Sequence, residues 1–349
     1  MYITNTACIS PQRTFDNSFF EGKIQVYRGD RYTAIEPEYG KLIPAGLLRR
    51  MGKAVRMGVG AGLPLMQDAD VEGIILGTAN GGLEDCLKFL NQIVDYNEGT
   101  LTPTNFVQST PNAVAGNLAL MSKTTGYNAT HVHNSLAFEA ALLDAILLLE
   151  EKKIKKLLVG NVEEISDYNH NIDSLSGSFK TGNYTSETLL TSDSPGSVNG
   201  EGACMFVIGS EPGRETVARL RDVCQSSYLD GNEVAERCDD FLQRNGLAAE
   251  QIDTLILGFS GDNRTDYIYD NLASQLFPAS NIYTYKNMVG NYPTASAFAA
   301  WLGVQLLGGQ QMPAECIYQK SSSEKAKNVL IYNHSKGTQH GFILLDNQF

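Results

Sequence analysis

The chain has 349 residues, of which 42% are hydrophobic and 19% are charged, and its formal net charge is −12. This length suits two domains or one large duplicated α/β unit, and the composition is that of a globular protein. The negative charge argues against a nucleic-acid ligand. No stretch is long and apolar enough to predict a membrane helix, and the first residues lack the basic start and apolar core of a secretory signal.

Six cysteines are scattered along the chain without the spacing of a metal site. We therefore expect reduced thiols in a cytoplasmic protein, with no metal and no cofactor.

The first part of the chain predicts alternating strands and helices. In order we expect a strand at 2–9, an irregular region at 15–43, a helix from 47 toward 63, a buried strand at 72–77, a helix at 83–96, a loop at 102–111 and an Ala-rich helix at 112–122. The glycine-rich turn at 77–82 has neither a following Lys-Ser/Thr nor GxGxxG spacing. It therefore indicates a close-packed turn rather than a phosphate loop.

The centre of the chain predicts a βαβ unit. A short strand at 129–133 breaks at Asn134-Ser135, a helix that is apolar almost all round begins at Leu136, and a second strand follows at 157–160. Ser135 would lie at the positive end of this helix, where a nucleophile or an oxyanion is stabilised. A plain helix cap by Asn134 and Ser135 explains the same residues without any chemistry.

The second part of the chain repeats this rhythm. After a polar excursion at 166–199 we expect strands at 200–209 and 214–223, a helix at 232–245, a strand at 254–259, a helix at 266–276, a strand at 282–283, a small-residue helix at 295–307 and closing strands at 329–332 and 341–345. Strands alternate with helices twice over. The sequence thus predicts an α/β fold with two similar halves, residues 1–210 and 211–349, in an α/β/α/β/α layered arrangement.

Six short motifs occur in an order that resembles the β-ketoacyl synthase family of the thiolase-like fold, over essentially the whole chain. They are the glycine-rich turn at 77–82, Pro111-Asn112 before a small-residue helix, Gly126 nine residues before Ser135 with Ala141 and Ala145 after it, Gly160-Asn161-Val162-Glu163-Glu164, Gly200-Glu201-Gly202-Ala203, and Lys286-Asn287-Met288-Val289-Gly290-Asn291. Each motif is weak alone, but six in order predict the fold. They do not predict the activity.

The resemblance also implies where catalytic residues would lie. Active members use a cysteine nucleophile and two histidines, which serve acyl transfer and decarboxylation. Here these positions carry Ser135, Ser260 and Asn291, and only Lys286 keeps the family's residue. The family's glycine-rich gate corresponds to residues 334–338, so the resemblance places Phe138, His334, Lys336 and Gly337 at the substrate.

A ketosynthase fold without Cys-His-His resembles the chain-length-factor type of subunit, which shapes the acyl pocket of an active ketosynthase in type II polyketide or fatty-acid-like pathways. The expected partners are then an acyl carrier protein and an active ketosynthase, in a homo- or heterodimer. The resemblance also implies that the dimer pairs through the strand at 129–133 and the apolar and small residues of 112–122. Two alternatives use the same pocket: a serine acyltransferase or thioesterase with Ser135 as nucleophile and His334 as its base, and a malonyl decarboxylase.

Several other polar residues allow two interpretations. His131 and His133 could ligate a metal, but no further ligand is near in sequence, so structural roles are favoured. Lys286 could be a remnant of the pocket or a buried partner of Glu139. Asp262 and Asp266 fit a turn and a helix cap. The basic clusters at 49–56 and 152–156 could receive an acidic carrier protein, although solvated helix ends explain them better.

Overall fold

The computed structural model describes residues 1–16, 18–67, 69–231, 233–321 and 325–349. Its main sheet has 11 strands in the order β11-β10-β9-β12-β13-β8-β1-β7-β5-β3-β4. The first half contributes β1 (Tyr2–Ile9), β3 (Gly73–Thr78), β4 (Tyr127–Val132), β5 (Lys156–Glu163) and β7 (Gly202–Gly209). The second half contributes β8 (Ala218–Ser227), β9 (Thr254–Leu257), β10 (Asn281–Thr284), β11 (Ile317–Gln319), β12 (Asn328–Ser335) and β13 (Gln339–Asp346).

The two halves share one topology. If β11 is set aside, each half contributes five strands to the sheet. Numbered 1 to 5 in chain order within each half, these strands lie in the order 3-2-4-5-1 from the outer edge of the sheet to its centre in both halves. The extra strand β11 lies at the outer edge of the second half. The halves join where β1 pairs with β8 through Tyr2–Arg219 and Ile3–Ala218. This repetition is the duplicated α/β unit that the sequence predicts.

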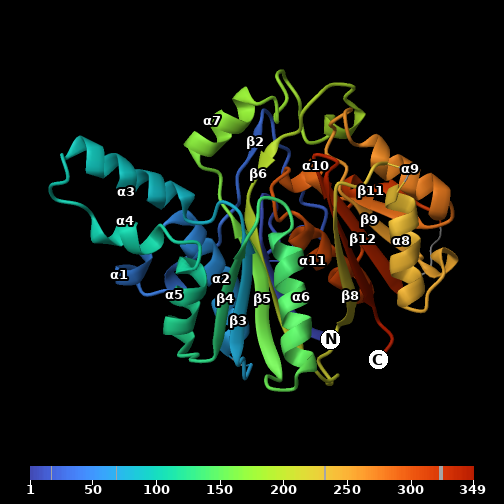
Figure 1. Ribbon diagram of the computed structural model, residues 1–349, viewed down its shortest axis with the longest axis horizontal. Helices are drawn as coiled ribbons and strands as arrows, with labels where there is room; N and C mark the ends of the chain where they lie inside the picture. Colours follow the sequence, from blue (N-terminus) through green and yellow to red (C-terminus); the bar gives the residue numbers. More distant parts are fainter. Residues whose placement is uncertain (17, 68, 232, 322–324) are drawn as a thin grey trace.

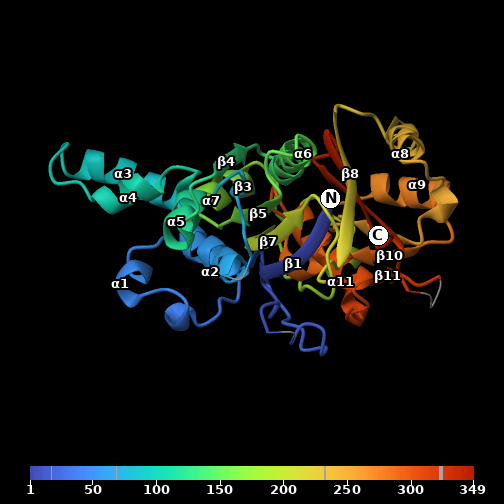
Figure 2. The same cartoon turned by 90° about the horizontal axis from the view of Figure 1, so that it is seen from below.

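Two helices lie between the strands of the first half and the strands of the second half. Further helices cover the outer face of each half (Figures 1 and 2). The middle layer consists of α6 (Ala137–Glu150) and α11 (Ser296–Leu307), which share one apolar core with strands of both halves. The outer layers are α2 (Lys53–Gln67) with α5 (Ala113–Ser122), and α8 (Glu233–Arg244) with α9 (Tyr267–Leu276). The predicted α/β/α/β/α arrangement is therefore confirmed.

The middle layer explains why the sequences of α6 and α11 are apolar on nearly all sides. Every residue of α11 except Gln305 is buried, because sheets lie on two sides of it and α6 packs against it. In α6 the buried positions include Phe138, Glu139 and Ala145, while Leu143 and Leu147 stay exposed. A helix that contacts two sheets needs apolar residues on more than one face.

The structure differs from the sequence prediction in several short elements. The helix expected from residue 47 is two helices, α1 (Ala45–Leu48) and α2. The expected loop at 102–111 contains α4 (Pro103–Gln108), which packs on α3 (Leu83–Asp95), and this pair projects from the first half (Figure 1). The polar excursion contains α7 (Asp167–Leu175), and its end forms β6 (Asn199–Gly200), which pairs with β2 (Arg31–Tyr32).

No helix in the described part of the chain is both long and apolar enough to cross a membrane.

Candidate functional site

The candidate site lies where parallel strands of both halves end. In the first half, β4 and β5 run parallel to β3, so the turn after β4 and Glu163-Glu164 at the end of β5 reach the same edge. In the second half, β10 and β12 run parallel to β9, which brings the segments after these strands to a common edge. Carboxyl ends of parallel strands are the usual position of ligand sites in α/β folds.

Ser135 lies on the turn between β4 and α6, as predicted. It is buried, and its hydroxyl makes no hydrogen bond to any residue that the structure describes. The neighbouring His133 does not activate it. The Nδ1 atom of His133 accepts the backbone N–H groups of Ser135 and Leu136, at 3.2 and 3.1 Å. His133 is therefore the cap of this turn, a role that the sequence assigned to Asn134 and Ser135.

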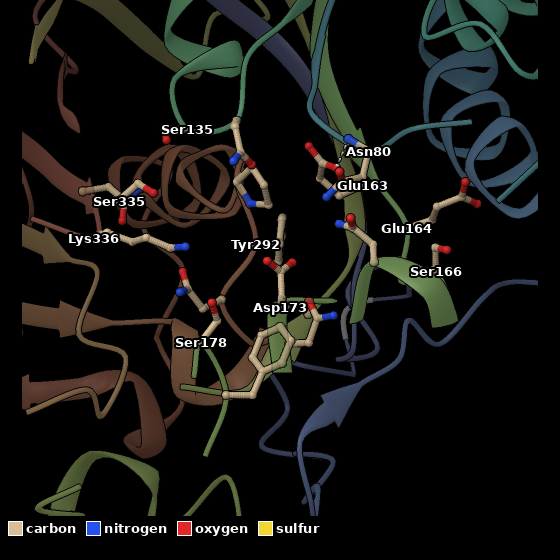
Figure 3. A pocket seen from close by; sticks show the side chains of 18 of the residues that line it. Asn80, Ser135, Glu163, Glu164, Ser166, Asp173, Ser178, Tyr292, Ser335 and Lys336 are labelled. Atoms are coloured by element: carbon tan, nitrogen blue, oxygen red, sulfur yellow. Dashed lines mark hydrogen bonds between the residues drawn. The ribbon is translucent and has the colours of Figure 1, made fainter. Parts of the chain in front are cut away.

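Two adjoining cavities bring together the residues that the sequence predicts at the catalytic positions. The first, of about 280 Å³, is lined by Ser135, Asn291, His334 and Lys336 among others (Figure 3). The second, of about 300 Å³, is lined by Ser260 and Lys286 and shares Asn291, His334 and Lys336 with the first. The four predicted catalytic positions thus surround one region of the molecule, and their chemical roles stay predictions.

The cavity at Ser135 is polar, whereas the sequence led us to expect an acyl-sized pocket. Its lining contains amide, hydroxyl and carboxyl side chains, among them Asn80, Asn134, Glu163, Glu164, Ser166, Asn169, Asp173, Asn199, Asn333 and Thr338. Figure 3 shows Glu163 and Glu164 on one side of this cavity and Lys336 on the other. This lining does not form an apolar acyl tunnel.

Phe138 lies outside both cavities, which differs from its expected place at the substrate. Its side chain is fully buried in the core between the sheets, with its ring centroid 5.7 Å from that of Phe206. Because α6 lies between two sheets, the first-turn residue Phe138 faces packed apolar side chains.

We expect Phe138→Ala to destabilise the fold by about 3–5 kcal/mol, since it leaves a cavity in the core. Phe138→Leu should cost clearly less because it removes less volume. Chemical denaturation of both variants measures this difference. An unfolding free energy of Phe138→Ala close to that of the wild type would contradict the placement of Phe138 in the core.

Ser260 is held in place by Asp266. The carboxylate of Asp266 accepts the Ser260 backbone N–H at 3.0 Å, the Ser260 hydroxyl at 3.1 Å and the Gly261 N–H at 2.7 Å. Asp266 makes no side-chain cap to α9, so its expected helix-cap role is wrong. Asp262 forms an ion pair with Arg264 at 2.6 Å in the same loop.

His334 is a structural residue in this geometry. Its Nδ1 accepts the Gly337 N–H at 3.3 Å, its Nε2 lies 3.3 Å from the Thr265 carbonyl oxygen, and its ring stacks on Tyr269. Burial, and then the nearby Lys286 charge, hold the pKa of His334 well below its usual value. With both ring nitrogens engaged, His334 does not act as the base of Ser135. Gly337, which lines neither cavity, positions His334 through its N–H.

Glu139 and Lys286 are both buried but do not form an ion pair among the described residues. Both carboxylate oxygens of Glu139 lack a hydrogen-bond partner there. Burial raises the pKa of Glu139 to about 7. Burial lowers the pKa of Lys286 to about 8, although Asp266 and Glu139 act in the opposite direction. Of the two alternatives for Lys286, a direct contact with Glu139 is therefore not the one that the described residues show.

The buried Glu139 carboxyl predicts a pH-dependent stability. Its folded-state pKa of about 7 exceeds its ordinary value of 4.5, so the folded protein binds this proton more tightly than the unfolded chain. The contribution of this group to the unfolding free energy is therefore fully present below pH 4.5 and is lost as the pH rises from 4.5 through about 7. We expect Glu139→Gln to raise the unfolding free energy by roughly 2–3 kcal/mol at pH 8 and to change it little at pH 5.

Denaturation of wild type and Glu139→Gln at the two pH values tests this expectation. The other buried carboxyls are common to both proteins and cancel in the comparison. An equal difference at pH 5 and pH 8 would show that Glu139 does not titrate in this way.

The first basic cluster is partly occupied by internal ion pairs. Lys53 contacts the buried Glu201 carboxylate, and Arg56 contacts Glu36 at 2.7 Å through two nitrogens.

Among the described residues, no group of His, Cys, Asp and Glu has the arrangement of a metal site. His131 instead contacts Asp144 at 2.8 Å.

Lys180 is a site-forming residue that the sequence did not indicate. Its buried ammonium group donates to the Ser194 carbonyl and hydroxyl oxygens and to the Gly261 carbonyl oxygen, at 2.9, 2.8 and 2.7 Å. It ties the polar excursion to the loop that follows Ser260. A single lysine in a polar segment gives no signal of this long-range contact.

Comparisons with known proteins bear on the family and the fold of the chain. Residues 30–178 match the family model of the β-ketoacyl synthase N-terminal domain. None of the curated proteins compared with the chain matches it in sequence.

Solved structures of similar fold cover the chain almost completely. A chain of the complex between a ketosynthase (ApeO) and its chain length factor (ApeC) from Xenorhabdus doucetiae has a TM-score of 0.80 and 17% identity, and the match covers 99% of this chain and 98% of that one. The ishigamide ketosynthase/chain length factor has a TM-score of 0.77 and 20% identity, with 99% and 98% covered. A β-ketoacyl synthase from Burkholderia phymatum STM815 has a TM-score of 0.78 and 16% identity, with 100% and 99% covered.

The TM-scores of these matches establish the fold, and the segment that matches the family model contains Ser135. Residues 30–178 are therefore similar to the N-terminal domain of β-ketoacyl synthases, and the whole chain has the thiolase-like fold seen in solved ketosynthase structures.

Proposed function

We propose that the chain is a catalytically degenerate β-ketoacyl synthase-like subunit of the chain-length-factor type. In this role it pairs with an active ketosynthase in a type II polyketide or fatty-acid-like pathway and helps to shape the acyl pocket of that partner. The observation that carries the proposal is that Ser135, Ser260 and Asn291, which occupy the positions where the resemblance implies cysteine and two histidines, surround one region of the fold.

The surroundings of these residues support the proposal. A serine hydroxyl is a weak nucleophile unless a base accepts its proton. His133 accepts backbone N–H groups and His334 is engaged on both nitrogens, so neither ring is placed to accept the proton of Ser135. At the second position, the Ser260 hydroxyl already donates to Asp266.

The neighbouring structures support the choice of partner. Two of the solved structures carry both a ketosynthase and a chain length factor in their descriptions. A third of similar fold, at TM-score 0.74 and 16% identity, is a type II polyketide synthase acyl carrier protein in complex with its ketosynthase. By analogy we assign an active ketosynthase and an acyl carrier protein as partners of this chain. The proposed boundary between the halves, residue 210, follows directly after β7.

Co-expression with ketosynthases encoded in the same genome tests the proposal. We expect one of them to co-purify with this chain in equal amounts and to depend on it for full activity. Full activity of every candidate ketosynthase without this chain, together with failure to exchange subunits, would leave the proposal without support.

A serine acyltransferase, a thioesterase and a malonyl decarboxylase are the alternatives, and the position of Ser135 in the wall of a cavity favours them over a purely structural serine. Mass spectrometry after incubation with acyl- and malonyl-loaded carrier proteins separates them. An acyl adduct on Ser135 supports the acyltransferase or thioesterase, and loss of carbon dioxide without an adduct supports the decarboxylase. The absence of both supports the partner-subunit function.

A further inference from the structure

Strand β1 is paired along its whole length on one side only. On that side it pairs with β7 as far as Ile9, whereas on the other side β8 pairs with Tyr2 and Ile3 alone. From Thr4 onward, no described strand pairs with this second side. β1 therefore presents an open strand edge inside the molecule, next to the contact that joins the two halves.

The backbone groups of Thr6 and Cys8 face this open edge. Opposite Cys8 on β7, the N–H of Cys204 donates to the side-chain oxygen of Asn161 on β5, at 2.8 Å. Cys204 thus turns its backbone groups toward β5, so its partner Cys8 turns its own groups away from β7. Because this orientation alternates along an antiparallel pair, Thr6 faces the same way as Cys8.

Two side chains already satisfy part of the edge. The Thr6 N–H donates to Asn5 Oδ1 at 2.9 Å, and the Cys8 carbonyl oxygen accepts the Thr14 hydroxyl at 2.9 Å. The Thr6 carbonyl oxygen and the Cys8 N–H form no bond across the edge to a described residue. An acceptor and a donor that flank Ala7 are thus free. One residue of a parallel strand bonds both such groups, since it donates to the residue before its opposite number and accepts from the residue after it.

A cavity of about 540 Å³ lies against this edge. Residues from Thr4 to Ile9 line its floor, and α2 and α11, which both pack on β1 and on β7, contribute to its walls. The wall side chains are mainly apolar, namely Leu42, Ala61, Pro64, Val217, Trp301 and Val304. A strand added here would lie between the same two helices as β1, and the volume is within the range of about 300–1,000 Å³ of ligand sites.

The charge at this cavity favours a basic group on the ligand. Glu38 is the one charged side chain among the described residues that line it, and it is exposed. The neighbouring Glu36 is paired with Arg56, whereas Glu38 forms no ion pair in the described part of the chain. A lone carboxylate beside an apolar cavity attracts a ligand that carries a positive charge.

We propose that the open edge of β1 binds an extended peptide segment of a partner protein, with apolar side chains and one basic residue. The segment runs parallel to β1, and its residue opposite Ala7 donates its N–H to the Thr6 carbonyl and accepts the Cys8 N–H. Its apolar side chains contact the walls, and its basic group lies near Glu38. Strand addition to a sheet edge is a general mode of peptide recognition.

This inference goes beyond the partner-subunit function. The cavity shares no lining residue with the two cavities at Ser135 and Lys286, and neither a ketosynthase nor a carrier protein enters its test. A negative result here would leave the proposed function untouched.

Trp301 makes occupancy of the cavity observable, because it is the single tryptophan of the chain and lines this cavity. The test titrates the full-length protein with the peptide acetyl-Lys-Val-Thr-Val-Thr-Val-amide and follows tryptophan fluorescence. Two isomers of the peptide carry two N-methyl groups each, either on both threonines or on the first two valines. Alternate residues of a strand face the same edge, so we expect a saturable change with the parent peptide and about tenfold weaker binding of one isomer than of the other.

The charge is tested separately. Glu38→Gln should weaken the parent peptide about threefold and leave a peptide with norleucine in place of lysine unchanged. Glu187→Gln is the matched control, because Glu187 is exposed and does not line this cavity.

Three outcomes would overturn the proposal. One is the absence of a saturable change at millimolar peptide. Another is equal binding of the two N-methylated isomers, which would indicate an apolar cavity without backbone pairing. The third is a change of tryptophan fluorescence with protein concentration that the peptide does not affect, which would assign the edge to a second copy of the chain.

Discussion

Purified protein is expected to form no β-ketoacyl product from acyl- and malonyl-loaded carrier proteins, and Ser135→Cys is expected not to restore the reaction. The introduced thiol would lie at the N-terminal end of α6, where a thiolate is stabilised, so it should react with iodoacetamide. Condensation also needs the two imidazoles. General acid–base groups contribute about 10²–10⁴-fold each, and groups that act as a unit fail together.

The measurement compares product formation by wild type, Ser135→Cys and an active ketosynthase in one assay. Peptide mapping distinguishes labelling at position 135 from labelling at the native cysteines, of which all but Cys86 are buried. A labelled variant without product is the expected result. Product formed by the wild-type chain above a contaminant control would show that Ser135, Ser260 and Asn291 support catalysis after all.

The sequence predicted the central unit of the fold because its apolar pattern is strong. The run after Ser135 is apolar on nearly all sides, which only a central helix between two layers satisfies, and β5 contains the apolar run 157–160 because both its faces are buried there. The six motifs then predicted which strand ends meet, and the structure brings Ser135, Ser260, Lys286 and Asn291 to adjoining cavities.

The sequence did not predict features that depend on contacts between distant segments. The helices α4 and α7 have polar sequences without a clear apolar face, so their periodicity gives little signal. Asp266 has the sequence of a helix cap, yet its carboxylate bonds Ser260 and Gly261, which precede it in the chain. Lys180 contacts the Gly261 carbonyl across 81 residues. Side chains that satisfy remote backbone groups are invisible to local patterns.

The interface prediction also needs correction in its details. The sequence placed the apolar residues of 112–122 at a subunit interface. Ala113, Val114, Ala115 and Leu118 instead pack into the chain's own core, and of the large apolar residues in this helix Leu120 remains exposed. The helix thus divides its apolar residues between the fold and the surface.

The surface beside β4 still predicts that the protein is a dimer. β4 is the last strand of the main sheet and pairs with β3 on one side, so its outer edge is open among the described residues. Exposed apolar side chains lie on β4 and on the helices that adjoin it, namely Val132, Leu120, Leu143 and Leu147. Open strand edges and apolar patches of this kind are normally covered by another chain.

We therefore expect a homodimer when the chain is expressed alone, with an interface of roughly 2,000 Å² or more. Leu120 is 80% exposed in the single chain, so Leu120→Asp should change the unfolding free energy of the monomer only slightly. In the dimer the same substitution would bury an unpaired carboxylate, which is costly. We expect this variant to shift the protein to monomer at micromolar concentration, as measured by size exclusion with light scattering.

Leu175→Asp is the matched control, because Leu175 is 83% exposed on α7, away from β4. It should remain dimeric and should elute with the wild-type protein. A wild-type chain that is monomeric at micromolar concentration would rule out the interface, and equal dissociation by the two substitutions would place the interface elsewhere. If Leu120→Asp alone dissociates the dimer, the edge of β4 is also the surface that an active ketosynthase would occupy, since a heterodimer with the same fold would compete for it.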